Sequence, residues 1–376
     1  MKRRVVLLAL LVFAVPASAA HLPILASQDA FPTFAPDGRH VAFSVIVNGQ
    51  GRAFELDVVD AQTKRVRTIG HNAGSPSASW SSDNRIAWTS GGILYTANAD
   101  GTGKRRYLAP KPSYAPAWRP HSAELAYLTA HGAVNLDLWV AGALWAKDAI
   151  GAPSWSPDGT SLAFAREGEI AVATGPGQER SLAATVGEPS APVFSPDGTK
   201  VAYAAAGRVY VVPADGSSAP ALVAGPFGGV TGLAWAPASD VLAYSVPAGL
   251  ELTTLAPVPH SQLFAPGAAA GASFSPTDPH GDVLAFAGPV SGCPGHHGIR
   301  IYGQGLLAGT CAIDGTPGPD VIEGTQSWGD VIRAGAGNDR IHAGDRHTDR
   351  IDCGSGRDTV WADKVDKLTG CEIVHR

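Results

Sequence analysis

The chain has 376 residues and a formal net charge of −5, and only 16% of its residues are charged. This mildly acidic composition contains no basic stripe, which argues against a protein that binds nucleic acid through a cationic surface. Beyond the N-terminus no apolar stretch is long enough to cross a bilayer, so we expect no transmembrane segment in the mature chain.

Residues 1–20 have the layout of a secretory signal peptide. Residues 2–4 are Lys-Arg-Arg, an apolar run follows over residues 5–15, and the small residues Ala17-Ser18-Ala19 come next. A membrane anchor is the alternative, but the apolar run is much shorter than the roughly 20 residues that a spanning helix requires. We therefore predict that residues 1–20 are removed and that the mature protein is secreted or held in the cell envelope.

An aromatic residue followed by a turn and an apolar strand recurs about every 40 residues along residues 21–311, a period that suits one four-stranded blade of a β-propeller. In the best copies Pro-Asp-Gly follows the aromatic anchor, because Pro fixes φ, Asp bonds back to the backbone and Gly accepts a positive φ. A strand of alternating pattern comes next, as in Val201–Tyr203. The seven anchors are Phe34, Trp80, Trp118, Trp155, Phe194, Trp235 and Phe274.

The strings FSPDG and WSPDG, with Ala-Asp-Gly turns at residues 99–101 and 214–216, resemble the repeats of TolB-like (WD40-like) β-propellers. The family implies six blades as a common number, whereas seven anchors favour seven. We expect one blade to contain strands from both ends of the chain, because an open ring would leave strand edges unpaired. The two candidate closing strands are residues 22–25 and Leu306–Ala308.

Catalytic signatures are scarce in the propeller region. Asp37, Asp158 and Asp197 share one turn position, where local hydrogen bonding explains them, and the aromatic anchors are better explained by packing between blades. The chain has no nucleophile elbow, P-loop, H-E-x-x-H or dinucleotide fingerprint, and too few residues remain for the hydrolase domain of prolyl-oligopeptidase relatives. The adjacent His296 and His297 are a candidate pair of transition-metal ligands, although neighbouring loop side chains more often point apart.

All four cysteines lie in the last quarter of the chain, and export would bring them to an oxidising compartment. Four cysteines allow three pairings, and no C-x-x-C is present. We favour the two local pairs because each closes a short loop and the two loops are equal in length. These predicted disulfides are Cys293–Cys311 and Cys353–Cys371.

Residues 312–376 change to a composition rich in Gly and Asp. Five aspartates recur at a spacing of nine or ten positions, each with a large apolar residue two positions later: Asp320, Asp330, Asp339, Asp349 and Asp358. The pattern resembles the hemolysin-type (RTX) nonapeptide, whose units wind into a parallel β-roll that binds calcium between turns. The resemblance implies calcium, because glycine turns can aim carbonyl oxygens inward and the carboxylate supplies charge.

Only three of the five units keep the glycine at the fourth position of the repeat, and Trp328 and His347 replace it in the other two. Since one coil takes two units, we predict calcium on one edge of the roll. The alternative is a metal-free roll held by its core and by Cys353–Cys371. The predicted calcium site consists of Asp320, Asp339, Asp358, Gly318, Gly335, Gly337, Gly354 and Gly356.

These patterns together predict an all-β protein, a β-propeller followed by a short parallel β-roll. We expect a secreted, non-enzymatic binding or scaffold protein whose partner is an envelope protein or a glycan. One alternative is a secreted propeller enzyme of the polysaccharide lyase or hydrolase type, with its site in the central funnel, and another is a TolB-like envelope-assembly component. Carboxylates, His or Arg converging at one end of the channel would favour the enzyme.

Overall fold

The computed structural model confirms the all-β fold: every regular element that it describes is a β-strand. No helix among the described residues is long and apolar enough to span a membrane. Residues 1–20, which are predicted to be a signal peptide, and Cys293, Cys311 and His296 lie outside the residues that the structure describes. The structure describes residues 25–26, 28–47, 53–63, 66–73, 78–109, 112–131, 135–190, 192–256, 258–266, 271–278, 283–289, 297–301, 305–308, 312–315, 317–323, 330–344, 346 and 348–376.

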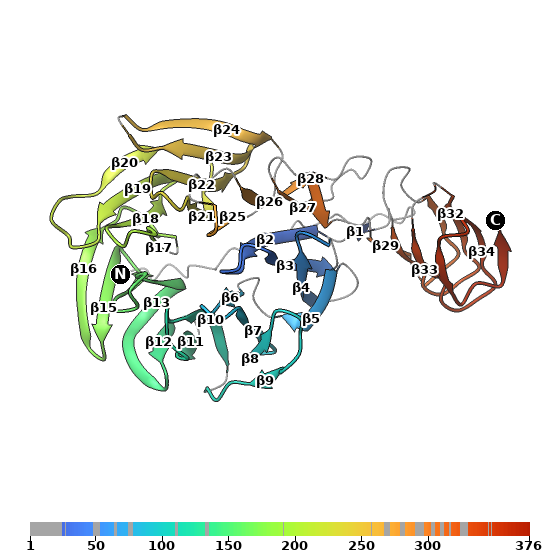
Figure 1. Cartoon of the computed structure of the whole chain (residues 1–376), viewed down its shortest axis with the longest axis horizontal. Coiled ribbons are helices and arrows are strands. Elements are labelled where there is room, and N and C mark those ends of the chain that lie inside the picture. The colour runs from blue at the N-terminus through green and yellow to red at the C-terminus, as the bar shows by residue number, and fades with distance from the viewer. Residues whose placement is uncertain are drawn as a thin grey trace, which may run out of the picture.

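Among the described residues, the strands from residue 28 to residue 308 follow one another as seven antiparallel units of four strands arranged in a ring, the propeller (Figure 1). Strand pairing continues from the first unit into the second and from the third unit into the fourth. The first unit contains β2 (Gln28–Phe34), β3 (His40–Val47), β4 (Ala53–Asp60) and β5 (Val66–Ala73), and the second β6 (Ser79–Trp80), β7 (Arg85–Ser90), β8 (Ile93–Asn98) and β9 (Arg105–Arg106). The third contains β10 (Ser113–Trp118), β11 (Leu125–His131), β12 (Asn135–Val140) and the start of the long β13 (Ala143–Trp155). The end of β13 belongs to the fourth unit, with β14 (Leu162–Arg166), β15 (Glu169–Gly175) and β16 (Gln178–Ala184).

The last three units repeat the same order of strands. The fifth contains β17 (Val193–Phe194), β18 (Lys200–Ala205), β19 (Arg208–Pro213) and β20 (Ala221–Ala224), and the sixth β21 (Thr231–Trp235), β22 (Val241–Val246), β23 (Gly249–Thr254) and β24 (His260–Pro266). The seventh contains β25 (Ala272–Phe274), β26 (Leu284–Pro289), β27 (His297–Ile301) and β28 (Gly305–Ala308).

The Pro-Asp-Gly turns form as their residue types dictate. In the fifth unit Gly198 has a φ of 72°, its N–H donates to the Ser195 carbonyl at 2.9 Å, and the Thr199 N–H donates to Asp197 Oδ1 at 2.9 Å. Asp158 has the same role in the fourth unit, where hydrogen bonds from the Ser156 hydroxyl and from Thr160 lower its pKa. The prediction that these aspartates serve the turns is confirmed.

The first strand of each unit lies innermost, where the first strands of neighbouring units contact one another (Figure 1). Two kinds of side-chain bond join them. The Trp80 indole N–H donates to the Thr33 carbonyl of the preceding unit at 3.0 Å, and Ser79 Oγ accepts the Trp118 N–H of the following unit at 2.9 Å. The same indole bond joins Trp155 to Ala117 and Trp235 to Val193, and the same serine bond joins Ser154 to Phe194 and Ser273 to Phe34.

The bond from the Phe34 N–H to Ser273 Oγ, at 3.1 Å, closes the ring between the seventh and first units. Phe34 and Phe43 also pack against Ala285 across this junction. The expectation that one blade contains strands from both chain ends is wrong, because β28 completes the seventh unit from its own sequence. The early strand β1 (Leu25–Ala26) pairs instead with β29 (Ala312–Asp314).

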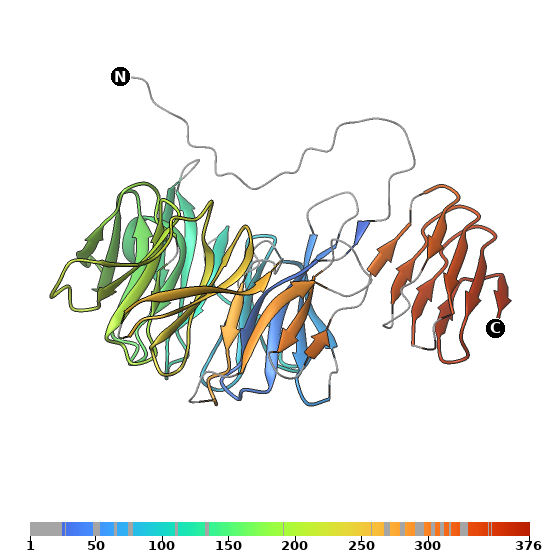
Figure 2. The same ribbon diagram turned by 90° about the horizontal axis from the view of Figure 1, so that it is seen from above.

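Residues 312–376 form a β-roll of two parallel sheets beside the propeller (Figure 2). One sheet contains β29, β31 (Val331–Arg333), β33 (Arg350–Asp352) and β35 (Lys367–Thr369), with β1 added antiparallel at its edge. The other contains β30 (Val321–Glu323), β32 (Arg340–Ala343), β34 (Thr359–Ala362) and β36 (Ile373–His375). The apolar residue two positions after each repeat aspartate is buried between the sheets: Ile322, Ile332, Ile341, Ile351 and Val360.

A candidate metal centre in the roll

An acidic residue directly precedes each strand of the second roll sheet. Because these strands pair in parallel register, their preceding residues form one column along an edge of the roll. We call this the Asp339 column, and its members are Asp320, Asp339, Asp358 and Glu372.

Three carboxylates of the Asp339 column accept the backbone N–H of the acidic residue one coil earlier. Asp339 Oδ1 accepts from Asp320 at 2.9 Å, Asp358 Oδ1 from Asp339 at 2.8 Å, and Glu372 Oε2 from Asp358 at 2.8 Å. Asp339 and Asp358 are removed from solvent, at 1% and 0% exposed, whereas Asp320 is partly exposed and Glu372 is exposed. One oxygen of Asp339, of Asp358 and of Glu372 is therefore committed to joining the coils.

The second oxygen of Asp339 and that of Asp358 are buried and have no hydrogen-bond partner in the described part of the chain. Burying a charged oxygen without a partner is unfavourable. Burial raises the pKa of Asp339, and the charges of Asp358 and Asp320 raise it further. The column thus holds several like charges close together, which a bound proton or a bound cation would relieve.

The glycines before these aspartates let the coils approach closely. A Cβ on Gly356 would lie 1.5 Å from the Gly337 carbonyl oxygen, and a Cβ on Gly337 would lie 2.6 Å from that of Gly318. Gly337 and Gly356 also have φ values of 137° and 146°, which side chains rarely adopt. These carbonyl oxygens lie in the turns that carry the carboxylates, so the local donor set is composed of hard oxygens, the ligands that calcium prefers.

Gly335 and Gly354 contribute differently. A Cβ on Gly354 would lie 1.8 Å from the Gly335 oxygen, and that oxygen accepts the Ser355 N–H at 3.0 Å. These two glycines therefore have a role in stacking the coils whether or not an ion binds. Within the described residues no three His, Cys, Asp or Glu side chains already converge on one point. An ion at this edge would combine carboxylates of successive coils with main-chain carbonyls.

The opposite edge has a similar ladder, the Asp349 column. Asp349 Oδ1 accepts the Asp330 N–H at 2.6 Å, and Asp366 Oδ1 accepts the Asp349 N–H at 2.9 Å. The two edges are thus more alike than the sequence suggested, because the carboxylate-to-amide bond depends on the aspartate alone. The turns of this edge that contain Trp328 and His347 fall outside the described residues, and one-sided calcium binding stays a prediction.

Sequence reasoning missed the last member of each column. The separation along the chain is 14 between Asp358 and Glu372 and 17 between Asp349 and Asp366. Neither matches the separation of 19 that joins the aspartates of the regular coils. A weaker signal was present, because both precede an apolar residue by two positions, as in Asp366-Lys367-Leu368 and Glu372-Ile373-Val374.

The centre of the propeller offers little ionisable chemistry among the described residues. The innermost segments are β2, β6, β10, residues 150–155 of β13, β17, β21 and β25, and Asp29 is the one charged residue in them. They are otherwise rich in Ala, Ser, Pro and Gly. A catalytic funnel would bring carboxylates, His or Arg together at one end. These segments do not provide that set.

Comparison with known proteins places the fold. No family model matches the chain, and no curated protein matches it. A chain of the structure titled "Crystal Structure of Mitotic Checkpoint Complex" is similar, with a TM-score of 0.53, 16% identity and coverage of 74% of this chain and 96% of that chain. The β-propeller domain of Cps50 (Swd1) from Myceliophteria thermophila has a TM-score of 0.52 and 13% identity over 75% of this chain and 99% of that chain. The β-propeller fold is therefore shown for about three quarters of the chain.

Proposed function

We propose that this protein is an exported, non-enzymatic binding protein in which a TolB-like propeller presents a surface to an envelope protein or glycan and an RTX-like roll binds calcium. The observation that carries the calcium assignment is the Asp339 column, where two carboxylate oxygens are buried without a hydrogen-bond partner among the described residues. A divalent cation would neutralise this repulsion and use those oxygens. Calcium suits the site because it accepts carboxylate and carbonyl oxygens in flexible geometry.

Asp320, Asp339 and Asp358 would supply the carboxylates, and Gly318 and Gly337 would supply carbonyl oxygens. The bound ion would contribute charge neutralisation and cross-linking of successive coils. The chain's own residues hold the coils in register through their carboxylate-to-amide bonds. Because burial and neighbouring charges raise the pKa of Asp339, protons should compete with calcium at a higher pH than for an exposed aspartate.

Two features support a scaffold for the propeller. Its innermost strands carry almost no ionisable residues, and its units are fixed to one another by repeated side-chain bonds. Similar propeller chains include one from a structure titled as a protein complex. A rigid ring of this kind presents its loops as a binding surface. No observation in the described residues specifically favours the enzyme.

Calorimetric titration of the full chain with CaCl2, after removal of divalent ions, tests the calcium assignment. We expect binding to the unmutated protein, a loss of at least about tenfold in affinity for Asp339→Asn, and little change for Asp330→Asn. The two aspartates have equivalent positions on the two edges and are both buried, so Asp330→Asn controls for the loss of a buried charge in the roll. Absence of binding to the unmutated protein would favour the metal-free roll, and equal losses from both variants would contradict one-sided binding.

A further inference from the structure

The final coil of the roll is shorter than the others, yet it places a carboxylate in the same column. Asp339 and Asp358 have a separation of 19 along the chain, whereas Asp358 and Glu372 have a separation of only 14. β32 pairs with β34 through Arg340 and Thr359, and β34 pairs with β36 through Thr359 and Ile373. In each case the acidic residue comes directly before the paired residue. Glu372 therefore occupies the position of the next aspartate in the Asp339 column.

The chemistry of the substitution fits the geometry of the shortened coil. Glu372 Oε2 accepts the Asp358 N–H at 2.8 Å, the same distance as that between Asp358 Oδ1 and the Asp339 N–H. A glutamate carboxylate lies one methylene further from its backbone than an aspartate carboxylate. The longer side chain reproduces in the last coil the bond that aspartate makes in the regular coils.

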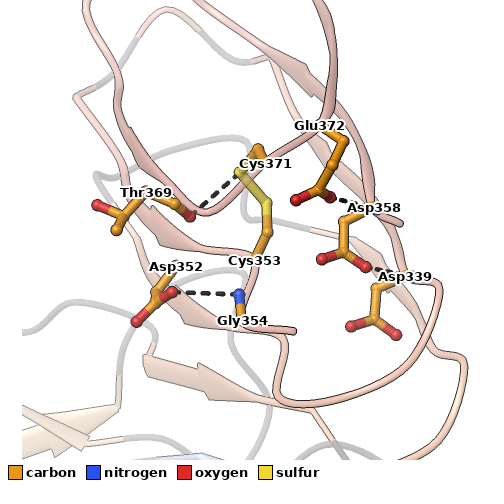
Figure 3. Close-up of a disulfide and its surroundings, with 8 residues drawn as sticks. All are labelled: Asp339, Asp352, Cys353, Gly354, Asp358, Thr369, Cys371 and Glu372. Carbon is orange, nitrogen blue, oxygen red and sulfur yellow. Dashed lines mark hydrogen bonds between the residues drawn. A yellow bond between two sulfur atoms is a disulfide. The ribbon is translucent and has the colours of Figure 1, made fainter. Parts of the chain in front are cut away.

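The Cys353–Cys371 disulfide adjoins this carboxylate. Cys371 directly precedes Glu372, and its Cα lies 5.2 Å from that of Cys353, which is fully buried among the apolar residues of the roll. The Cys353 N–H also donates to the Thr369 carbonyl at 2.9 Å. Figure 3 shows the disulfide beside the line formed by Glu372, Asp358 and Asp339. The disulfide thus ties the backbone of Glu372 to the core of the preceding coil.

We propose that Glu372 and Asp358 form a terminal cation site at the C-terminal end of the Asp339 column, and that the Cys353–Cys371 disulfide is the element that positions Glu372 for it. The proposal rests on the proposed calcium function. What the terminal site adds to that function is Glu372, whose Oε2 accepts the Asp358 N–H at 2.8 Å, beside an Asp358 carboxylate whose Oδ2 is buried without a hydrogen-bond partner in the described chain. The buried, unbonded oxygen of Asp358 and the exposed carboxylate of Glu372 are both hard oxygen donors, the kind of ligand that calcium prefers.

Titration of the full chain with CaCl2 tests the ligand role through two variants that keep the disulfide. We expect Glu372→Gln to remove one bound ion or to weaken the terminal site by at least tenfold, because the ligand charge is lost. We expect Glu372→Asp to show a similar loss, because its charge remains but its reach is one methylene shorter. Asp366→Asn, which changes the last acidic residue of the opposite column, should leave calcium binding near that of the unmutated protein.

The double variant Cys353→Ser/Cys371→Ser tests the positioning role. It should reproduce the calcium loss of Glu372→Gln, and combining the two changes should add little, whereas Cys293→Ser/Cys311→Ser should retain the terminal site. Hydrogen exchange without calcium gives a readout independent of the metal: the Asp358 amide should lose protection in Glu372→Ala, which removes the acceptor oxygen, and should keep it in Glu372→Gln, which retains one. The Glu372 variants decide the ligand role even if the cysteine variant unfolds the roll, because they retain the disulfide.

The outcomes separate this inference from the proposed function. If the unmutated chain binds no calcium, both fail. If it binds calcium and Glu372→Gln binds the same number of ions with the same affinity, the terminal site is refuted while the calcium function stands. If Glu372→Gln loses the ion and the folded cysteine variant keeps it, the positioning role of the disulfide is refuted.

Discussion

Both repeat arrays of this chain join one repeat to the next through a side chain that binds the neighbouring backbone, but the chemistry of the bond differs. In the propeller the Trp155 indole donates to Ala117, and Ser154 accepts from Phe194. In the roll Asp358 accepts from Asp339. The indole bond uses its single donor, whereas a carboxylate that binds one amide keeps a second oxygen. The side-chain bond between repeats therefore has only a structural role in the propeller, whereas in the roll it leaves one carboxylate oxygen that can bind a ligand.

The aspartates of the two regions show the consequence in their ionisation. Hydrogen bonds at a surface turn lower the pKa of Asp158, which favours its charged form. Burial and neighbouring carboxylates raise the pKa of Asp339, which disfavours its charged form. Predicting function from aspartate spacing alone would treat the two residues alike. Their surroundings separate a turn residue from a candidate ligand.

Replacing the coil-stacking Gly356 by alanine should give the largest loss of stability. A Cβ there would lie 1.5 Å from the Gly337 oxygen, so the coils would have to separate. We expect a loss above about 4 kcal/mol, an exceptional value for one substitution, because overpacking and strain at an unusual φ act together at this position. Hydrogen exchange of peptides from residues 330–376, measured in the full chain, would show the loss of protection.

Gly168 in the propeller is the matched control for Gly356. It also has a positive φ, of 77°, but a Cβ there would meet nothing within 4 Å. Gly168→Ala should therefore cost only the conformational penalty of about 1–2 kcal/mol. Equal effects of the two substitutions would show that backbone conformation, and not the close approach of the coils, determines the need for glycine in the roll.

The sequence specified the local units of both arrays and left the closing contacts undetermined. The anchor and its turn act within one unit, which is why the position of Asp197 in a turn could be predicted. Ring closure depends on the bond between Phe34 and Ser273, whose separation along the chain is 239, and no local pattern encodes it. Glu372 was missed for a related reason, since its place in the column depends on how far the last coil is shortened.

Asp57→Asn should stabilise the propeller at neutral pH, by an amount that lies between the effects of Gly356→Ala and Trp155→Phe. Asp57 lies on β4, two positions before Val59, which packs at the junction of the first and seventh units. Burial raises the pKa of Asp57 to about 6, and the charge of Glu55 also raises it. A folded pKa above the ordinary value of about 3.9 means that ionisation opposes folding. The contribution of Asp57 to the free energy of unfolding should therefore rise as the pH falls from about 7 to about 4.

Urea unfolding of the unmutated protein and of Asp57→Asn at a series of pH values measures this effect. The pKa difference corresponds to at most about 3 kcal/mol, and we expect a gain of about 1–3 kcal/mol for Asp57→Asn at pH 7.5 that disappears near pH 4. Asp158→Asn should act in the opposite direction, because its pKa is lowered in the fold. A loss of stability for Asp57→Asn at pH 7.5 would mean that its charge is compensated in the folded protein.

Trp155→Phe should give the smallest effect and tests the bond that joins the units of the propeller. The substitution removes the indole N–H that donates to Ala117 at 3.2 Å while retaining an aromatic ring in the core. Trp118 provides a matched control, because its indole nitrogen is buried without a hydrogen-bond partner in the described chain. The two rings have similar surroundings, since an arginine lies over each of them, 5.3 Å from the ring centre of Trp118 and 5.2 Å from that of Trp155. Both substitutions remove similar apolar volume, so their difference isolates the hydrogen bond, which is worth about 0.5–1.5 kcal/mol. Thermal unfolding should therefore show a larger loss for Trp155→Phe than for Trp118→Phe. Equal losses would mean that packing, and not the indole hydrogen bond, holds neighbouring propeller units together.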